Sequence, residues 1–284
     1  MMDVYIVIPC HNEATLITQT LDSLVTQTVL PKKIVVVNDH STDNSEEVIY
    51  AFAKAYPFIT LVNSNAKSQH LPGSKVIQAF QKGLDTLDEN YDIICKFDAD
   101  LIFPPDYIET IIEHFKEDSK VGMAGGFCYI KQQDKWVLEN LTNKDHIRGA
   151  LKAYRKACFK QINGLKAAMG WDTVDELQSK YYGWHIVTNE RLAVKHLKPT
   201  GNTYTKAAKY KQGQAFYGMR YGFILTTIAS LKLALRKKKI KFFFDYMSGY
   251  FRAKREQQPY LVTKEEGIFI RKLRWQGIIS KITP

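Results

Sequence analysis

The chain has 284 residues, of which 45% are hydrophobic and 12% aromatic, so it can build a packed core, which argues against global disorder. Its four cysteines are widely spaced and form no CxxC pair, which favours reduced, buried thiols over a disulfide framework or a zinc site. Residues 195–284 carry 20 Lys and Arg against 4 Asp and Glu, a net charge of +16, whereas the remaining residues carry 20 against 25, a net of −5, and the sum is +11.

Short apolar runs alternate with helical spacing over the first hundred residues. The expected strands are residues 4–8, 34–37, 61–62 and 92–97, and the expected helices are 16–25, 41–56 and 73–87. Strands that alternate with helices of this length are typical of βαβ units and of a mostly parallel sheet.

The pattern changes after residue 100. A glycine-containing strand is expected over 121–130, and residues 136–138 can pair with it, so the sheet becomes mixed. Further elements are a helix near 154–161, a helix over 174–182, a strand at 192–194 and long helices from Tyr204 onwards. The sequence therefore predicts an α/β domain over 1–200, with a mixed, mostly parallel sheet flanked by helices, and a basic, amphipathic helical region over 201–284.

Polar residues follow three of the expected strands, in the segments 9–13, 38–43 and 98–100. Any one of these segments taken alone is equally well explained as a turn followed by a helix cap. Ligands of open α/β sheets bind beyond the carboxyl ends of the strands, however, and three such ends from neighbouring strands converge on one crevice.

The pair Asp98 and Asp100 follows a strand that looks buried on both sides. Two carboxylates in that position repel each other unless a cation or hydrogen-bond donors offset their charge. Oxygen ligands of this kind suit Mg²⁺ or Mn²⁺, with phosphate oxygens completing the coordination. No Walker-type glycine loop is present and no G-x-G-x-x-G follows the first strand, so P-loop hydrolysis and dinucleotide redox chemistry lose their main support.

Three motifs in this order, Pro9-x-x-Asn12-Glu13, the run from Val36 to Ser45, and Phe97-Asp98-Ala99-Asp100, resemble those of the family 2 glycosyltransferases of GT-A fold. The resemblance spans roughly residues 3 to 200. It implies an inverting reaction, in which a carboxylate base deprotonates the acceptor hydroxyl that displaces a nucleoside diphosphate.

The resemblance also implies roles for individual residues. Asp39 is expected to bind the base of the nucleotide, and the segment from Pro9 through His11 to Glu13 is expected to lie along the nucleoside. Asp98 is expected to reach the ribose or a metal-bound water, and Asp100 to be the direct metal ligand.

The catalytic base is expected further along the chain. Family members place it in a Glu-Asp pair that opens a helix and lies eleven residues before a glycine, and here Trp171-Asp172 stands in that position before Gly183. Asp172 is the expected base, with a helix N-cap as the alternative role. Trp171 replaces the usual Glu, and either stacks on a sugar ring or packs in the core. Asp175 and Glu176 are the fallback candidates for the base.

His196 follows the expected strand 192–194 and resembles the late histidine that contacts the metal or the diphosphate in several family members. A lone histidine also serves structural roles as often as it binds a ligand. Asp39, expected at the base of the nucleotide, is compatible with UDP-, GDP- or dTDP-sugars, so the sequence does not identify the donor.

In the C-terminal region, aromatic and aliphatic residues flank the cationic run 236–239. Such a segment is typical of an interfacial helix on anionic lipid, although a helical cap on the catalytic domain with a solvated basic face is the alternative. The apolar stretch before the run is too short to span a bilayer. No nucleic-acid motif accompanies the charge, so nucleic acid is not an expected partner.

The sequence thus predicts a metal-dependent glycosyltransferase for a saccharide or lipid-linked acceptor in cell-surface polysaccharide or glycan synthesis. The chain opens with no basic segment or cleavage site, so a signal peptide is not expected. The expected location is the cytoplasm, at the inner face of the cell membrane. The alternatives are a nucleotide-sugar- or carbohydrate-binding module without turnover and a nucleotidyltransferase. Segment 9–13 supplies no glycine-rich signature for the nucleotidyltransferase.

Overall fold

The computed structural model describes residues 2–64, 74–139, 144–199 and 209–281. Its strands are β1 (Val4–Cys10), β2 (Lys33–Asn38), β3 (Ile59–Asn63), β4 (Ile93–Phe97), β5 (Leu101–Ile102), β6 (Val121–Gln132), β7 (Lys135–Leu138), β8 (Leu151–Arg155) and β9 (His185–His196). Its helices are α1 (Ala14–Val25), α2 (Ser45–Ala55), α3 (Lys75–Leu84), α4 (Tyr107–Glu117), α5 (Lys156–Gln161), α6 (Trp171–Tyr181), α7 (Lys211–Gly218), α8 (Gly222–Arg236), α9 (Lys241–Arg255) and α10 (Lys264–Ile279).

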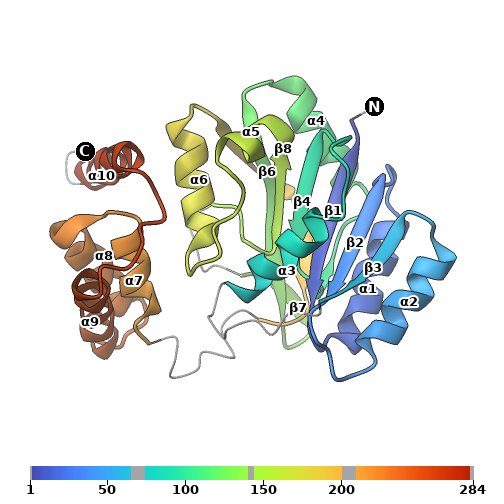
Figure 1. Ribbon diagram of the computed structural model, residues 1–284, viewed down its shortest axis with the longest axis horizontal. Helices are drawn as coiled ribbons and strands as arrows, with labels where there is room; N and C mark the ends of the chain where they lie inside the picture. Colours follow the sequence, from blue (N-terminus) through green and yellow to red (C-terminus); the bar gives the residue numbers. More distant parts are fainter. Residues whose placement is uncertain (1, 65–73, 140–143, 200–208, 282–284) are drawn as a thin grey trace.

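The strands form one sheet in the order β3-β2-β1-β4-β8-β6-β9-β5, and β7 pairs with β6. The neighbours from β3 to β4 run parallel, as do β6 and β9, whereas β8 is antiparallel to both β4 and β6. The expected α/β fold, with a mixed, mostly parallel sheet flanked by helices and a helical C-terminal segment, is confirmed (Figure 1).

The parallel strands are apolar because both faces of the sheet are covered. Residues 4–8 of β1 and 34–37 of β2 are at most 3% exposed, and they form the centre of the main core. In a parallel sheet of this order the carboxyl ends of β2, β1 and β4 lie next to one another, which brings the polar segments after these strands to one edge.

The structure corrects several of the expected boundaries. The second helix begins at Ser45 instead of residue 41, and the helix expected from Tyr154 begins at Lys156. Residues 151–155 form β8 instead, and its buried Lys152 interrupts the apolar pattern that would have indicated a strand. Helix α4 and strand β5 were not predicted. Gly73, Tyr204 and the predicted boundary between residues 200 and 201 lie outside the described residues.

The C-terminal helices gather on one side of the sheet, and α6 stands between them and the sheet (Figure 1). Val174 and Leu177 of α6 share a second apolar core with Ala215 of α7, Leu225 of α8 and Ile270 of α10. Helix α6 therefore belongs to the packing of both regions, because its other neighbours come from β6 and β9. None of the helices in the described parts of the chain combines the length and the apolar composition needed to cross a membrane.

Candidate active site

The first two strand ends contact each other through the backbone. Pro9 lies opposite Val37 in the parallel pairing of β1 with β2, so the segments that follow lie side by side. The backbone N–H of Asp39 donates to the Cys10 oxygen at 2.7 Å, and Nδ1 of His11 donates to the Asp39 oxygen at 2.6 Å. The structure thus brings together Pro9, His11 and Asp39 as the sequence predicted.

Side chains from the second loop hold the first loop in shape. Asn12 adopts a φ of 55°, which asparagine tolerates better than most residues, and its Oδ1 accepts from the Thr42 N–H at 2.7 Å. The Asn12 N–H donates to the Ser41 hydroxyl at 3.0 Å, and the Glu13 N–H donates to the Ser45 hydroxyl at 2.9 Å. Residues before Ser45 therefore form the loop that supports segment 11–13, and α2 starts after them.

Asp98 lies directly beyond β4, beside the buried ammonium group of Lys96. The two form an ion pair, in which the Lys96 side chain is 2% exposed and the Asp98 side chain 33% exposed. The ammonium group also donates to the Gly149 oxygen at 3.0 Å, and the Asp98 N–H donates to the Ala150 oxygen at 2.8 Å. Asp98 therefore has a fixed backbone, a compensated charge and one accessible face.

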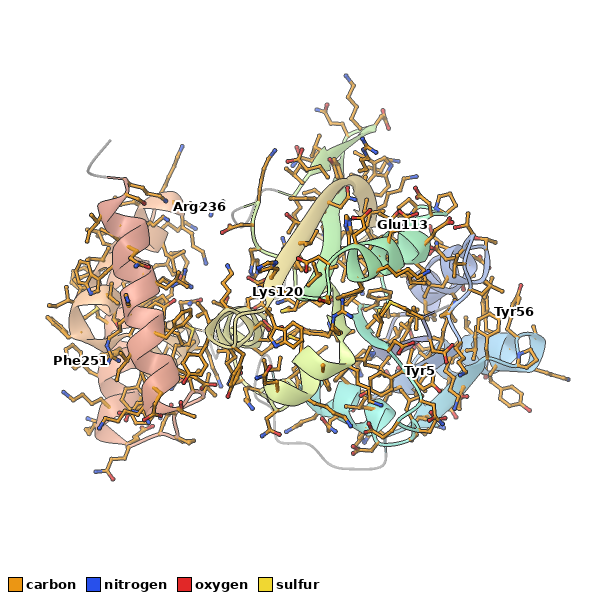
Figure 2. The ribbon with its side chains drawn as sticks, turned by 90° about the horizontal axis from the view of Figure 1, so that it is seen from above. Tyr5, Tyr56, Glu113, Lys120, Arg236 and Phe251 are labelled. Carbon is orange, nitrogen blue, oxygen red and sulfur yellow. The ribbon has the colours of Figure 1, made fainter. Side chains whose placement is uncertain are left out.

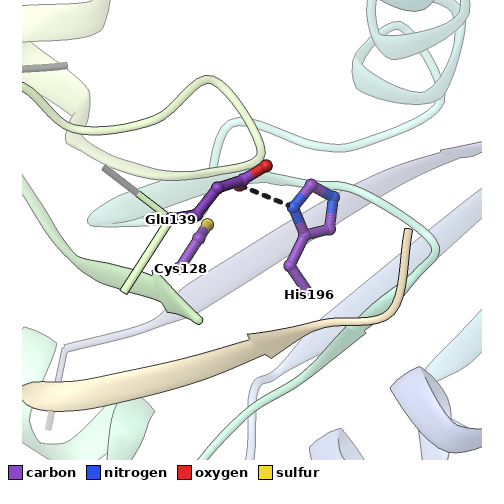
Figure 3. A group of neighbouring side chains, drawn as sticks. All are labelled: Cys128, Glu139 and His196. Atoms are coloured by element: carbon purple, nitrogen blue, oxygen red, sulfur yellow. Dashed lines mark hydrogen bonds and ion pairs between the residues drawn. The ribbon is translucent and has the colours of Figure 1, made fainter. Parts of the chain in front are cut away.

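Asp100 lies against His196, since β5 pairs with the end of β9. Nε2 of His196 lies 3.4 Å from Oδ2 of Asp100, and its Nδ1 lies 3.0 Å from Oε2 of Glu139 (Figure 3). Arg148 in turn lies 3.2 Å from the same Glu139 oxygen. Burial opposes the charged imidazole, but the ion pair with Asp100 and the hydrogen bond to Glu139 prevail and raise the pKa of His196 to about 9. The two acids of the Asp98–Asp100 pair thus each face a cation.

Cys128 completes a buried trio with Glu139 and His196, whose ligand atoms lie within 4.8 Å of one another (Figure 3). Burial raises the pKa of the Cys128 thiol to about 12, so at neutral pH it is a thiol and not the thiolate that binds metals. All four cysteines are free and buried, which confirms the expectation that these thiols lie in the core.

Glu13 joins the first loop to the end of β9. Both of its carboxylate oxygens accept from Lys198 at 2.6 Å. Burial raises the pKa of Glu13 against the opposing charge of Lys198, and the nearby Asp100 carboxylate adds to the increase. Glu13, Asp100 and Lys198 therefore lie in one electrostatic neighbourhood, which links the first strand end to the Asp98–Asp100 pair.

Helix α6 begins after Gly170, whose φ of 79° is in the region that favours glycine. Trp171 is 7% exposed, and its ring lies under two ammonium groups, with Lys96 at 5.4 Å and Lys152 at 5.7 Å from the ring centroid. The ring thus packs between the lysines of β4 and β8, and little of it can face a sugar in this structure. Through Lys96, the start of α6 contacts the Asp98 end of β4.

Asp172 lies in the first turn of α6 with a side chain that is 33% exposed, and the N-cap position belongs to Gly170. Nε2 of His146 lies 3.6 Å from Oδ2 of Asp172. Burial favours the neutral acid, but the charges of His146 and Lys152 prevail and lower the pKa of Asp172. The alternative role of Asp172 as a helix N-cap is therefore wrong, and its carboxylate is ionised and accessible at neutral pH.

The fallback candidates for the base face inward. Asp175 accepts from Lys152 at 2.8 Å and from the Tyr154 hydroxyl at 2.6 Å, and it is 2% exposed. Glu176 accepts from the Ile147 N–H at 2.9 Å and is 5% exposed. Burial raises the pKa of Asp175 to about 6. Neither carboxylate is positioned to meet an acceptor.

Sequence reasoning missed five residues that surround these acids, and all are basic: Lys96, His146, Arg148, Lys152 and Lys198. Lys96 had a usable signal, because a lysine between Cys95 and Phe97 in an apolar strand requires a buried partner. The others lie in segments without clear periodicity, and only the fold brings them to the acids.

A family model described as glycosyl transferase family 2 matches residues 5–162, which is more than half of the chain. The chain belongs to this family. The match includes the three strand ends, whereas Asp172 and His196 lie beyond it.

Two curated relatives of this family 2 glycosyltransferase are poly-beta-1,6-N-acetyl-D-glucosamine synthases of Staphylococcus. The Staphylococcus epidermidis protein is 27% identical over 166 residues, which are 56% of this chain and 35% of the relative. The Staphylococcus aureus (strain COL) protein is 28% identical with the same coverage. The match thus spans about a third of the length of these relatives.

Solved structures confirm the GT-A fold. A mannosyltransferase from Pyrobaculum calidifontis, in complex with GDP-Man and Mn²⁺, has a TM-score of 0.60 at 16% identity and covers 98% of this chain and 83% of its own. TarS residues 1–349 from S. aureus have a TM-score of 0.56 at 14% identity, and the match covers 90% of this chain and 73% of the TarS chain. At these identities the likeness concerns the fold alone.

Proposed function

We propose that this family 2 enzyme is an inverting transferase that moves a sugar from a UDP-, GDP- or dTDP-sugar to a hydroxyl of a saccharide or lipid-linked acceptor, in cell-surface polysaccharide or glycan synthesis. The observation that carries the proposal is the accessible, ionised Asp172 at the start of α6, held next to the Asp98 end of β4 through Lys96 and Trp171. The polysaccharide synthases among the relatives support the product class.

The nucleoside part of the donor lies, in this proposal, along Pro9, His11 and Glu13, with Asp39 at the base and Asp98 at the ribose. The hydrogen bonds between the first two loops support a preformed binding surface, since they fix segment 11–13 against Asp39. In this proposal Trp171 holds Lys96 and Lys152 in place instead of stacking on the sugar.

The residues around Asp100 fit a divalent metal. His196 turns Nε2 toward Asp100 while Glu139 holds Nδ1, an arrangement in which a carboxylate fixes the orientation of a metal-binding histidine. We infer that Asp100, with Asp98 beside it, would hold Mn²⁺ or Mg²⁺, and that the metal would take the place of the Nε2 proton of His196, because only the neutral imidazole is a ligand. The charge of the metal would stabilise the departing diphosphate. The Mn²⁺ in the mannosyltransferase complex agrees with this inference.

Asp172 is the proposed general base. As the acceptor oxygen bonds to the anomeric carbon and the bond from that carbon to the diphosphate breaks, the acceptor proton passes to the Asp172 carboxylate. His146 and Lys152 stabilise the ionised form of Asp172 before the reaction, so the base is ready at neutral pH.

Residues 201–284 are proposed to bind an anionic membrane surface, on the inner face of the cell membrane, which would bring the enzyme to a lipid-linked acceptor. Free thiols at all four cysteines agree with a reducing compartment. The alternative without turnover, a nucleotide-sugar- or carbohydrate-binding module, differs in one measurable respect, the release of nucleoside diphosphate.

The test is to incubate the purified chain with Mn²⁺ and a panel of UDP-, GDP- and dTDP-sugars, with cell-derived lipid and saccharide acceptors, and to measure nucleoside diphosphate release. We expect release from one donor that EDTA abolishes and that falls at least about 100-fold in Asp100→Asn. Asp85→Asn, an exposed carboxylate at the end of α3, is the matched control and keeps activity. Donor binding without release under all conditions would favour the binding module.

A further inference from the structure

Exposed apolar side chains are concentrated on the C-terminal helices. Of the fifteen large apolar side chains that are exposed in the described residues, twelve lie between residues 223 and 279. Scattered exposure is normal on a protein surface, but a concentration of this kind marks a surface that contacts a partner.

Four of these side chains form a stripe along α8. Ile224, Ile228, Leu231 and Leu235 follow each other at intervals of three and four residues, so they share one face of the helix. They are 61%, 37%, 43% and 64% exposed, respectively. Among the described residues, each of these four side chains therefore keeps more than a third of its surface exposed.

Exposed apolar side chains occur on α9 as well. Ile240, at the N-cap of the helix, and Phe244 and Phe251 within it are 58%, 62% and 50% exposed and recur at helical spacing, so they share one face. The rings of Phe223 and Phe251 lie 5.9 Å apart, which joins the two helices at the far end of the hairpin. We call the exposed apolar side chains of α8 and α9 the hairpin face.

Cations lie at both ends of the hairpin face. Arg236, Lys238, Lys239 and Lys241 are exposed at the turn between α8 and α9. At the other end, a hollow of about 700 Å³ beside Phe251 is lined by Tyr210, Ser248, Arg252, Lys254 and Arg255. Figure 2 shows Arg236 and Phe251 on the C-terminal helices, apart from the sheet.

We propose that the hairpin face is the membrane-docking surface of the chain, with the apolar stripe among the acyl chains and the cations at the phosphate headgroups of anionic lipids. Apolar bulk between clustered cations is what an interfacial helix presents to such a bilayer. A second copy of the chain is a poorer occupant, because two cationic turns brought together repel each other.

This inference rests on the membrane binding proposed above and names the residues that carry it. It is tested independently of the transfer reaction, because binding is measured with no donor or acceptor present. The full chain is mixed with vesicles of phosphatidylcholine alone or with phosphatidylserine, and bound protein is measured by flotation at low and high salt. Binding to the anionic vesicles only, weakened by salt, is expected.

Two double variants test the two parts of the surface. Leu231→Ser with Leu235→Ser removes apolar contact, and Lys239→Glu with Lys241→Glu reverses two charges, and each is expected to weaken binding at least about tenfold. An acid at residue 241 suits the first turn of α9, so the charge variant should fold. The matched controls are Leu30→Ser and the pair Lys54→Glu with Lys116→Glu, all exposed on the sheet domain, and they keep full binding.

Four results would overturn the proposal. One is absence of binding by the unaltered chain to anionic vesicles at low salt. Another is equal binding by the hairpin-face variants and their controls. A third is a dimer of the unaltered chain, seen by light scattering, that is lost in the Leu231→Ser/Leu235→Ser variant, together with absence of vesicle binding. That result would assign the face to self-association. Competition by inorganic phosphate alone, without effect of the apolar variant, would assign the cations to free phosphate.

Discussion

Nε2 of His146 lies 3.6 Å from Oδ2 of Asp172, and Nδ1 of the same ring lies 3.0 Å from Oε2 of Glu176. Burial opposes a charged ring, but the ion pair with Asp172 and the hydrogen bond to Glu176 raise the pKa of His146 to about 9. Lys152 and Arg148 also act on Asp172, which lowers the pKa of its carboxyl further. His146 is thus an imidazolium at neutral pH that holds the proposed base ionised.

We expect His146→Gln to move the acidic limb of the pH profile of kcat/KM to higher pH. Without the imidazolium the pKa of Asp172 rises, so more of the proposed base is protonated at acid pH and the loss of activity is larger there than at neutral pH. His185→Gln, in an exposed pair with Asp118, is the control and leaves the profile in place. An unchanged acidic limb in His146→Gln would show that His146 does not act on the base.

The same pair makes stability depend on pH. Because the pKa of His146 is higher in the folded chain than its ordinary value of 6.5, its contribution is complete below pH 6.5 and is lost as pH rises through about 9. The contribution is at most about 3 kcal/mol. Urea unfolding at several pH values should show the difference between wild type and His146→Gln shrinking over this interval. A difference that is constant with pH would contradict the account.

We expect Lys152→Met to destabilise the fold by about 3–5 kcal/mol, since it leaves the buried Asp175 and Glu176 without their shared cation. The comparison is Lys156→Met, which removes a partly exposed pair with Glu89 and should cost about 1 kcal/mol or less. Chemical denaturation of both variants measures the two losses. Similar losses would mean that Lys152 is not the centre of the buried network.

Two glycines of the C-terminal helices should respond in opposite directions to alanine. A Cβ on Gly249 of α9 would lie 2.1 Å from the backbone oxygen of Tyr210, so Gly249→Ala should destabilise by about 1–3 kcal/mol. Gly277 of α10 has nothing within 4 Å of its Cβ position, so Gly277→Ala should stabilise by up to about 1 kcal/mol. Thermal unfolding gives both signs, and a neutral Gly249→Ala would contradict the close approach of residue 210 to α9.

The sheet could be predicted from the sequence where strands are apolar throughout, as in residues 4–8 and 34–37, because buried parallel strands carry an unambiguous signal. Strand β8 gave no such signal, since Lys152 lies inside it and its partner Asp175 is 23 residues away. A buried charge whose partner is distant in the sequence interrupts the apolar pattern, so a pattern of neighbouring residues does not indicate the strand.

Family motifs and strand ends indicated Asp98, Asp100, Asp172 and His196 as candidate site residues, and their roles stay predictions. Their electrostatic partners could not be named. Glu139 orients His196 from 57 residues away, and Lys198 reaches Glu13 across 185 residues. Trp171 shows the same limit. Its sequence position allowed either stacking on a sugar or packing in the core, and the lysines that cover its ring come from two other strands.

The most direct test of the central claim compares Asp172→Asn with wild type for donor affinity and for transfer, once the donor panel has identified the sugar nucleotide. If Asp172 is the base, donor affinity stays within about threefold while transfer falls at least about 100-fold. Transfer within about tenfold of wild type at unchanged donor affinity would contradict the account and move the search for the base to another carboxylate.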